Sequence, residues 1–247
     1  MSLRDHLVEL RNRLMKAFAA IAVGVALGWF LYVPVLNWLT HPLREVCSHN
    51  GCGNSVTNGK LLLTDPLEGL LLRVRVSAYV GLLVAMPVIL WQVWRFVAPG
   101  LYKKERKYAL LFVTSGTVLF AAGAGVAYLS LPKGLDWLGS VAGHQFATGY
   151  TASKYLQLIL YMMLIFGAAF QFPIILLTAQ GMGLVRARTL FRQWRWGVVL
   201  IAIVAAVITP SSDPISMFAL AVPLWVFYFG SALAGLFMQR HKGDATV

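Results

Sequence analysis

Long apolar runs separated by short polar stretches form the main pattern of the chain. The six runs lie at about 17–38, 70–97, 108–131, 155–180, 196–208 and 215–238. A helix needs roughly 20 apolar residues to cross the hydrocarbon core of a bilayer. The pattern therefore predicts an all-α integral membrane protein of six transmembrane helices, with residues 1–247 in a single membrane domain.

The residues before the first run have leucines at helical spacing. Leu3, Leu7, Leu10 and Leu14 form one apolar stripe, and charged side chains occupy the opposite face. This pattern predicts an amphipathic segment over 1–16 that lies on the membrane surface and leads into the first span. The first run is longer than the apolar core of a cleaved signal peptide, so we expect it to be retained.

Prolines mark the expected ends and irregularities of the helices. Pro66 and the acid Glu68 follow a polar cap and predict the start of the helix that contains the second run. Pro87 is expected to kink the second run and Pro173 to interrupt the fourth, because proline removes a main-chain donor. Pro132 is expected to close the third run.

The fifth run is short for a membrane crossing. Its 13 residues form about 20 Å of helix, against about 30 Å of hydrocarbon. Runs five and six are therefore either a re-entrant hairpin or two true but short spans that thin the bilayer locally. The bases that flank this pair favour two crossings.

The distribution of Lys and Arg predicts the orientation of the chain. Of the 21 bases, 15 fall on one side of the six predicted crossings, in the N-terminal segment, within 95–107, within 186–195 and in the tail. Cytoplasmic segments of membrane proteins carry the excess of Lys and Arg. We therefore expect a multi-pass protein with both termini cytoplasmic.

The composition supports a membrane protein and opposes a nucleic-acid-binding one. Hydrophobic residues make up 59% of the chain and charged residues 12%, with a mean hydropathy of +0.71, whereas soluble domains are about 25% charged. The net charge of +12 comes from bases at the ends of apolar runs rather than on one continuous face. We therefore expect contact with membrane lipid and no nucleic acid.

Sequence motifs of common enzymes and cofactor sites are absent. The chain contains no phosphate-binding loop of the type GxxxxGK[ST], no GxSxG and no HExxH. Its five histidines are scattered without metal-ligand spacing. The sequence therefore predicts a protein that is not an enzyme and holds no cofactor or metal.

Polar groups are sparse within the predicted spans. A chain of acids at depth, as expected of an ion-driven small-solute secondary transporter, is absent, and such a transporter is kept as the alternative function. The polar side chains at depth are glutamines, a residue type that commonly links neighbouring helices. They are Gln92, Gln157, Gln171 and Gln180. Gly24 and Gly28 form a GxxxG pattern, which is a weak indication of close packing because glycine is common in spans.

Two cysteines, Cys47 and Cys52, lie in a predicted outer loop. An oxidising compartment on that side would permit a disulfide between them. The alternative is two free thiols in a flexible loop, and the spacing leaves both possibilities open.

Two acids stand out on the predicted cytoplasmic side. Glu9 lies among the arginines of the N-terminal segment, and Glu105 is the single acid among four bases within 103–107. Taken singly, each acid balances local charge. A carboxylate can also bind a guanidinium through two parallel hydrogen bonds, which lysine matches less well. A pair of carboxylates on one side of the membrane therefore suits a ligand with two arginines.

Several motifs resemble those of the TatC family, the multispanning core subunit of the twin-arginine protein translocase. HLVELRNRL at 6–14 is similar to the N-terminal motif of that family, and PVILWQVWRFVAPGLYKKER at 87–106 to its first cytoplasmic loop signature. HP at 41–42, FGAAFQFP at 166–173 and TPSSDPIS at 209–216 resemble further family motifs in the expected order. The resemblance covers nearly the whole chain.

The resemblance implies a cup-shaped bundle of six helices in a bacterial-type cytoplasmic (inner) membrane. It implies a receptor for the twin-arginine signal peptides of folded cargo proteins, and a core component of the translocase that exports them with the proton motive force. It also implies an oligomeric complex with single-span subunits of the TatA and TatB type.

Matched position by position, the resemblance indicates candidate residues. Glu9 and Glu105 would hold the arginines of the signal peptide. The residues that would shape the recognition loop or lie near it are Phe96, Pro99, Leu101, Tyr102, Arg11 and Arg13. Pro42 and Asp213 match positions of structural or functional weight in the outer loops.

One position departs from the family pattern. The family usually has a glutamate in the motif FGxxFExP, and this chain has Gln171 there. Glutamine keeps the shape and hydrogen bonding of glutamate but carries no charge and cannot titrate. We therefore expect no proton transfer and no negative charge at this position, while contact with a polar group of a partner helix stays compatible with it.

Overall fold

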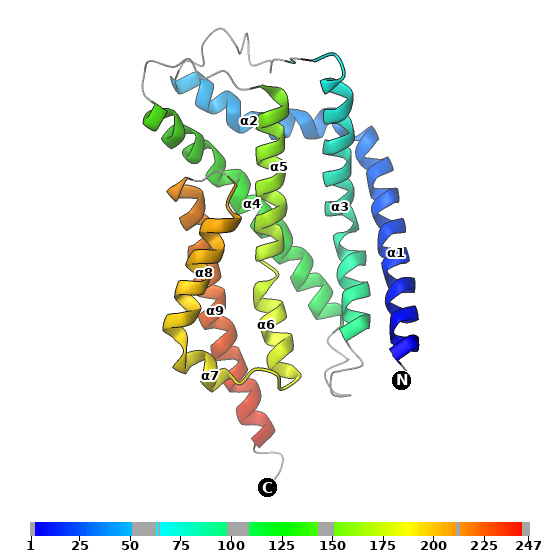
Figure 1. Ribbon diagram of the computed structural model, residues 1–247, viewed down its shortest axis with the longest axis vertical. Coiled ribbons are helices and arrows are strands. Elements are labelled where there is room, and N and C mark those ends of the chain that lie inside the picture. The colour runs from blue at the N-terminus through cyan, green and yellow to red at the C-terminus, as the bar shows by residue number, and fades with distance from the viewer. Residues whose placement is uncertain are drawn as a thin grey trace.

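The computed structural model describes residues 3–50, 63, 65–97, 109–142, 151–210 and 213–243, with side chains omitted near some of these ends. Helices make up almost all of this part of the chain, arranged as an elongated bundle (Figure 1). Their bounds are α1 Leu3–Phe30, α2 Tyr32–Asn50, α3 Glu68–Val97, α4 Ala109–Ala142, α5 Ala152–Ala169, α6 Phe172–Gly181, α7 Ala187–Arg192, α8 Trp194–Ile208 and α9 Pro214–Gly243.

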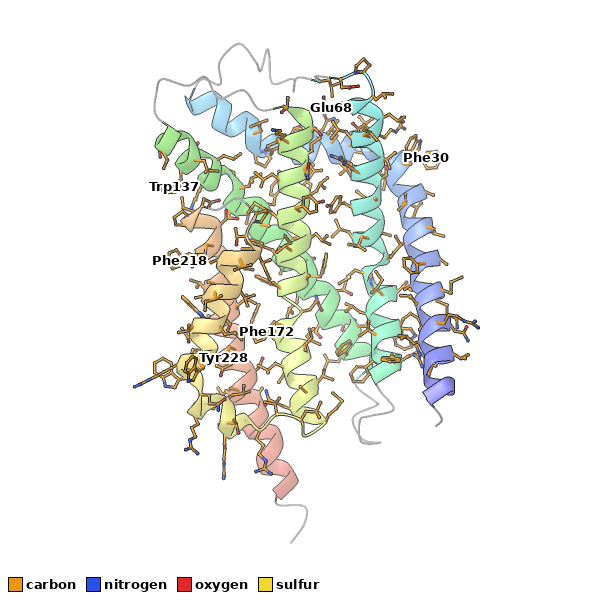
Figure 2. The ribbon with its side chains drawn as sticks, in the orientation of Figure 1. Phe30, Glu68, Trp137, Phe172, Phe218 and Tyr228 are labelled. Carbon is orange, nitrogen blue, oxygen red and sulfur yellow. The ribbon has the colours of Figure 1, made fainter. Side chains whose placement is uncertain are left out.

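The apolar helices confirm the predicted all-α membrane class. Within the described residues, five helical stretches are long and apolar enough to cross a bilayer. They are Val8–Phe30, Glu68–Phe96, Leu110–Val141, Ala152–Gly181 and Pro214–Leu236, and the shorter α8 is the sixth apolar helix. Many apolar side chains face outward, among them Phe30 and Phe218, which project from the bundle (Figure 2). Outward apolar faces on a helix bundle are suited to lipid.

The first helix differs from the sequence prediction at both ends. α1 runs unbroken from Leu3, so the predicted surface segment over 1–16 and the start of the predicted span over 17–38 are one helix. The helix then stops at Phe30, and the chain turns at Leu31 into α2, which crosses the end of the bundle (Figure 1). Leu31 still donates its N–H to Leu27 and accepts one from Val35, so the turn keeps its main-chain hydrogen bonds. Apolar composition alone did not reveal this change of direction.

Proline breaks only one of the predicted spans. The fourth span is interrupted as predicted, because α5 ends at Ala169 and α6 begins at Phe172 with Pro173 in its first turn. Pro132, by contrast, lies inside α4, which continues to Ala142. The prediction that Pro132 closes the third run was therefore wrong. Packed neighbouring helices make an internal proline tolerable in a membrane protein.

The buried core includes residues of α2, α3, α4, α5, α8 and α9. At one end of the bundle, hydrogen bonds hold α2 against α4 and α5. The hydroxyl of Tyr155 donates to the carbonyl oxygen of Leu39 at 2.8 Å. The hydroxyl of Tyr128 donates to the carbonyl oxygen of Trp38 at 2.9 Å, and the rings of Tyr128 and Trp38 stack with their centroids 4.2 Å apart. These contacts fix the crossing helix α2 onto α4 and α5.

α1 and α3 approach each other so closely that only small side chains fit between them. A Cβ on Gly24 would lie 2.5 Å from the carbonyl oxygen of Gly81, and one on Gly28 would lie 2.7 Å from that of Ser77. Both distances are too short for a real side chain. The GxxxG pattern is thus a true packing surface here, and it sets the spacing between α1 and α3.

Candidate functional site between the ends of α1 and α3

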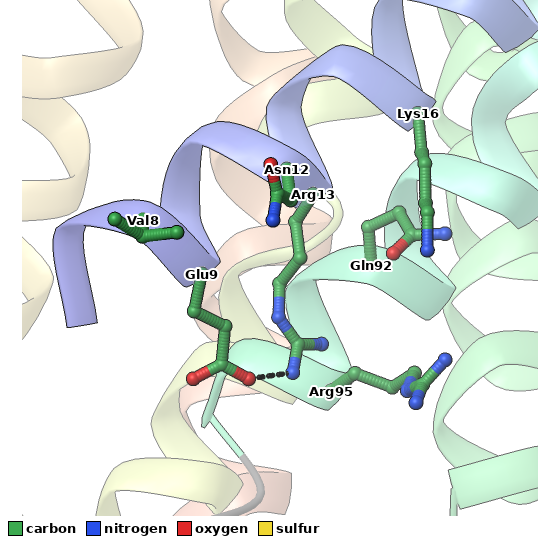
Figure 3. A pocket seen from close by; sticks show the side chains of 7 residues that line it. All are labelled: Val8, Glu9, Asn12, Arg13, Lys16, Gln92 and Arg95. Atoms are coloured by element: carbon green, nitrogen blue, oxygen red, sulfur yellow. Dashed lines mark hydrogen bonds and ion pairs between the residues drawn. The ribbon is translucent and has the colours of Figure 1, made fainter. Parts of the chain in front are cut away.

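A polar cleft of about 380 Å³ lies between α1 and the last turns of α3. This part of α1 and α3 is at the end of the bundle where α1 begins and α9 ends (Figure 1). Figure 3 shows the side chains that line it. They are Val8, Glu9, Asn12, Arg13 and Lys16 from α1, and Gln92 and Arg95 from α3.

Helical periodicity explains why these residues share one cleft. Glu9, Arg13 and Lys16 are spaced four and three residues apart, so they project from one face of α1. Gln92 and Arg95 are three residues apart and share one face of α3. Farther along the two helices, the glycine contacts bring the backbones together and hold these two polar faces opposite each other.

An ion pair occupies one side of the cleft. Nη2 of Arg13 donates to Oε1 of Glu9 across one turn of α1 (Figure 3). The side chain of Arg13 is 15% exposed and that of Glu9 28%, so the pair is partly shielded from solvent. The Nε and Nη1 atoms of Arg13 are buried and have no hydrogen-bond partner among the described residues.

The lining carries an excess of positive charge. Its charged residues are one acid, Glu9, and three bases, Arg13, Lys16 and Arg95. In Figure 3 the cationic ends of Lys16 and Arg95 lie on one side of the view and the Arg13–Glu9 pair on the other. The cleft therefore offers one carboxylate to a cationic ligand and three cations to an anionic one.

An aromatic contact anchors the end of α3 beside the cleft. The ring of Trp94 is buried and lies 4.6 Å from the ring of Phe112 on α4, measured between centroids. Trp91, one turn earlier, is exposed. Tryptophan is enriched where a helix leaves the hydrocarbon for the headgroups. We therefore expect the cleft to open at the level of the lipid headgroups.

The structure brings together part of the candidate residue set. Glu9 and Arg13 both line the cleft, while Arg11 is exposed on α1 and does not. Phe96 is half-buried in the last turn of α3. The remaining members of the predicted loop lie outside the described residues: Pro99, Leu101, Tyr102 and Glu105. The pairing of Glu9 with Glu105 thus stays a prediction.

Sequence reasoning assigned no site role to five of the lining residues, Val8, Asn12, Lys16, Gln92 and Arg95. The spacing from Glu9 through Arg13 to Lys16 could have indicated a shared polar face on α1. No local signal pointed to the contribution of α3, because the pairing of α1 with α3 is a property of the tertiary fold.

The three structural candidates, Pro42, Asp213 and Gln171, lie away from the cleft. Pro42 is fully buried inside α2. Asp213 is buried immediately before α9, where its Oδ2 accepts the N–H of Ser216 at 2.5 Å. Gln171 is buried at the α5–α6 junction, and its Nε2 donates to the carbonyl oxygen of Gly116 at 2.8 Å. Each of the three thus has a visible packing role.

The possible disulfide is not resolved by the structure. Cys47 lies in α2, but its side chain and all of Cys52 fall outside the part of the chain described in atomic detail. The described residues contain no group of three or more His, Cys, Asp or Glu that would hold a metal ion.

Comparison with known proteins gives concordant matches. The family described as "Sec-independent protein translocase protein (TatC)" matches residues 5–223. The TatC protein of Xylanimonas cellulosilytica is 37% identical over 248 residues, covering 100% of this chain and 87% of that protein. The TatC protein of Helicobacter pylori is 32% identical, covering 92% and 84%.

Solved structures show the same arrangement of helices. A crystal structure of the twin arginine translocase receptor TatC is similar with a TM-score of 0.73 and 30% sequence identity, over 94% of this chain and 98% of that one. A second crystal structure of this receptor, in the detergent DDM, has a TM-score of 0.74 and 28% identity, over 93% and 99%.

Proposed function

The chain belongs to the TatC family of Sec-independent protein translocase proteins, and we propose that it is the signal-peptide receptor and core component of a twin-arginine translocase. The solved relative is itself described as a twin arginine translocase receptor. The function is transport of folded proteins whose signal peptides carry two adjacent arginines. The family is one of transport proteins, and we assign no catalytic residue.

The observation that supports this proposal most directly is the place of Glu9. Its carboxylate lines an open cleft beside the last turn of α3, and the segment with Glu105 follows α3 directly in the sequence. A peptide guanidinium can replace Arg13 as the partner of Glu9, because a bidentate Arg–carboxylate pair forms equally well within or between chains. Glu105 supplies the second carboxylate in this proposal.

The remaining parts of the proposal follow from the charge distribution and the family. The excess of bases near the N-terminus, at 95–107 and at 186–195 supports a cytoplasmic position for the cleft and both termini. The membrane is the cytoplasmic (inner) membrane of a bacterial-type cell. TatA-type and TatB-type single-span subunits are the partners, and the proton motive force is the energy source.

Peptide binding to the purified protein tests the receptor function. A twin-arginine peptide should bind the detergent-solubilised chain, and replacing its Arg-Arg by Lys-Lys should weaken binding because lysine cannot form the two-bond fork. Glu9→Gln and Glu105→Gln should each weaken binding by roughly tenfold or more, as expected for the loss of a charge-assisted hydrogen bond of about 1.5–3 kcal/mol.

Asp136→Asn is the matched control, because it also removes one acid. Asp136 is exposed near the C-terminal end of α4, which lies at the opposite end of the bundle from the cleft (Figure 1). It should leave peptide affinity unchanged. Equal binding of the Lys-Lys peptide, or full binding by both glutamate variants, would reject the receptor proposal.

The family match and the names of the relatives support protein translocation rather than the small-solute transporter considered as the alternative. The described arrangement of helices is that of the solved receptor. Measured solute uptake into vesicles that contain the chain would instead support the small-solute transporter.

A further inference from the structure

The excess of bases in the α1–α3 cleft needs an explanation beyond the arginines of a peptide. Arg13, Lys16 and Arg95 line it together, against the single described acid Glu9. The positive charges of the facing bases repel one another, and each base would also repel an incoming dibasic peptide. An anion in the cleft would relieve both effects.

The position of the cleft restricts the kind of anion. The continuous apolar run of α1 begins at Ala17, directly after Lys16, and α3 ends at Val97, two residues after Arg95, so the cleft lies at the boundary of the apolar runs. Exposed apolar side chains flank the bases on α1, including Leu14, which is 52% exposed, and Met15, which is 65% exposed. A headgroup in the cleft could thus keep its acyl chains against an apolar helix face.

Arg13 has spare capacity to bind an anion. Only its Nη2 is assigned to Glu9, and its Nε and Nη1 have no hydrogen-bond partner among the described residues. A guanidinium binds phosphate oxygens through two parallel hydrogen bonds. The volume of about 380 Å³ falls in the usual range for small-molecule sites, about 300–1,000 Å³.

We propose that Arg13, Lys16 and Arg95 bind the phosphate of an anionic phospholipid from the leaflet that surrounds the cleft. Basic pockets between transmembrane helices on the cytoplasmic side are suited to anionic headgroups. The phosphate oxygens accept hydrogen bonds from the guanidinium of Arg13, and the negative charge of the phosphate neutralises Lys16 and Arg95. Glu9 is then less tightly held by Arg13. This site does not depend on the receptor function and stands without a signal peptide.

The experiment measures lipid binding to the full-length chain in neutral detergent. Short-chain phosphatidylglycerol is titrated by calorimetry, with short-chain phosphatidylcholine as the zwitterionic comparison and inorganic phosphate as the soluble one. Phosphatidylglycerol should bind more tightly than either. Replacing Arg95 by Gln should weaken its binding about fivefold, and R13Q/K16Q/R95Q should abolish the preference over phosphatidylcholine.

A matched control separates a defined site from general attraction to a basic protein. R186Q/R188Q/R192Q also removes three bases, two within α7 and one immediately before it. All three side chains are exposed and line no part of the cleft. This variant should keep the preference for phosphatidylglycerol. The charge-preserving variant K16R/R95K should keep it as well, which guards against a loss caused by misfolding.

Three results would overturn the proposal. The first is equal binding of phosphatidylglycerol and phosphatidylcholine by the unchanged chain. The second is an equal loss in the cleft variant and in the α7 control. The third is inorganic phosphate binding as tightly as the lipid and displacing it, because the site would then serve a soluble anion.

Discussion

The side-chain amide of Gln171 donates a hydrogen bond of 2.8 Å to the main-chain carbonyl oxygen of Gly116. This contact ties the junction of α5 and α6 to α4 across 55 positions of sequence. Both the amide and its partner lie at the packed interface, since Gln171 is only 9% exposed. The hydrogen bond requires a donor at position 171, and an ionised carboxylate offers none.

Gln171→Glu should make stability depend on pH. The glutamate keeps the bond to Gly116 only when it is protonated, so the folded chain holds a proton that the unfolded chain releases. Folding then binds protons, and stability falls as pH rises. Thermal unfolding in detergent between about pH 5 and about pH 8 should show the variant losing stability relative to the unchanged chain.

Gln171→Met is the control for this prediction, because methionine fills similar space and does not titrate. It should cost about 1 kcal/mol, the usual net value of one hydrogen bond, at every pH. A pH-independent effect of Gln171→Glu would contradict this prediction, because it would show that the ionised carboxylate accepts a hydrogen bond from another donor.

Gly81→Ala should destabilise the α1–α3 interface. A Cβ at this position would lie 2.5 Å from the main-chain nitrogen of Val25, so the two backbones must separate. Overpacking of this kind costs about 1–3 kcal/mol. Since the same spacing sets the cleft, peptide affinity should fall together with the unfolding temperature. Gly125→Ala is the matched control, because nothing lies within 4 Å of a Cβ there, and it should be neutral or slightly stabilising.

Asp213→Ala should loosen the start of α9. Oδ2 of Asp213 accepts the N–H of Ser216, three residues ahead, as a helix N-cap residue does. Its loss should cost about 0.5–2 kcal/mol of unfolding free energy. Asp213→Asn keeps an acceptor at the same place and should cost less. Equal destabilisation by Asn and Ala would indicate that the negative charge, rather than the cap, matters.

Glu68→Ala should separate the neighbouring ends of α3 and α5. The carboxylate of Glu68 is buried and accepts the N–H of Ser153 at 3.0 Å, in the first turn of α5. Losing a hydrogen bond to a charged group should cost about 1.5–3 kcal/mol. Hydrogen exchange should accelerate in the first turn of α5 more than at its end. Glu68→Gln keeps an acceptor and should protect that turn better than Ala; an unchanged exchange pattern in Glu68→Ala would contradict the link.

The apolar pattern by itself determined the class of the fold and most of its long helices. The short fifth run at 196–208 corresponds to α8, Trp194–Ile208, and the sixth run begins one residue from the start of α9. The break near Pro173 was also predictable. These features follow from side-chain hydrophobicity and from the missing donor of proline, both of which act within a few residues of sequence.

Tertiary structure decided how the helices meet. The turn at Leu31 and the continuation of α4 through Pro132 depend on neighbouring helices that replace lost local contacts. The bond from Glu68 to Ser153 joins positions 85 residues apart. The cleft likewise needs Arg95 of α3 beside Glu9 of α1. The sequence identified Glu9 as a candidate, and helical spacing places Arg13 and Lys16 on the same face of α1. Only packing of the two helices through Gly24 and Gly81 adds Arg95 of α3, because that proximity is created by the folded backbone.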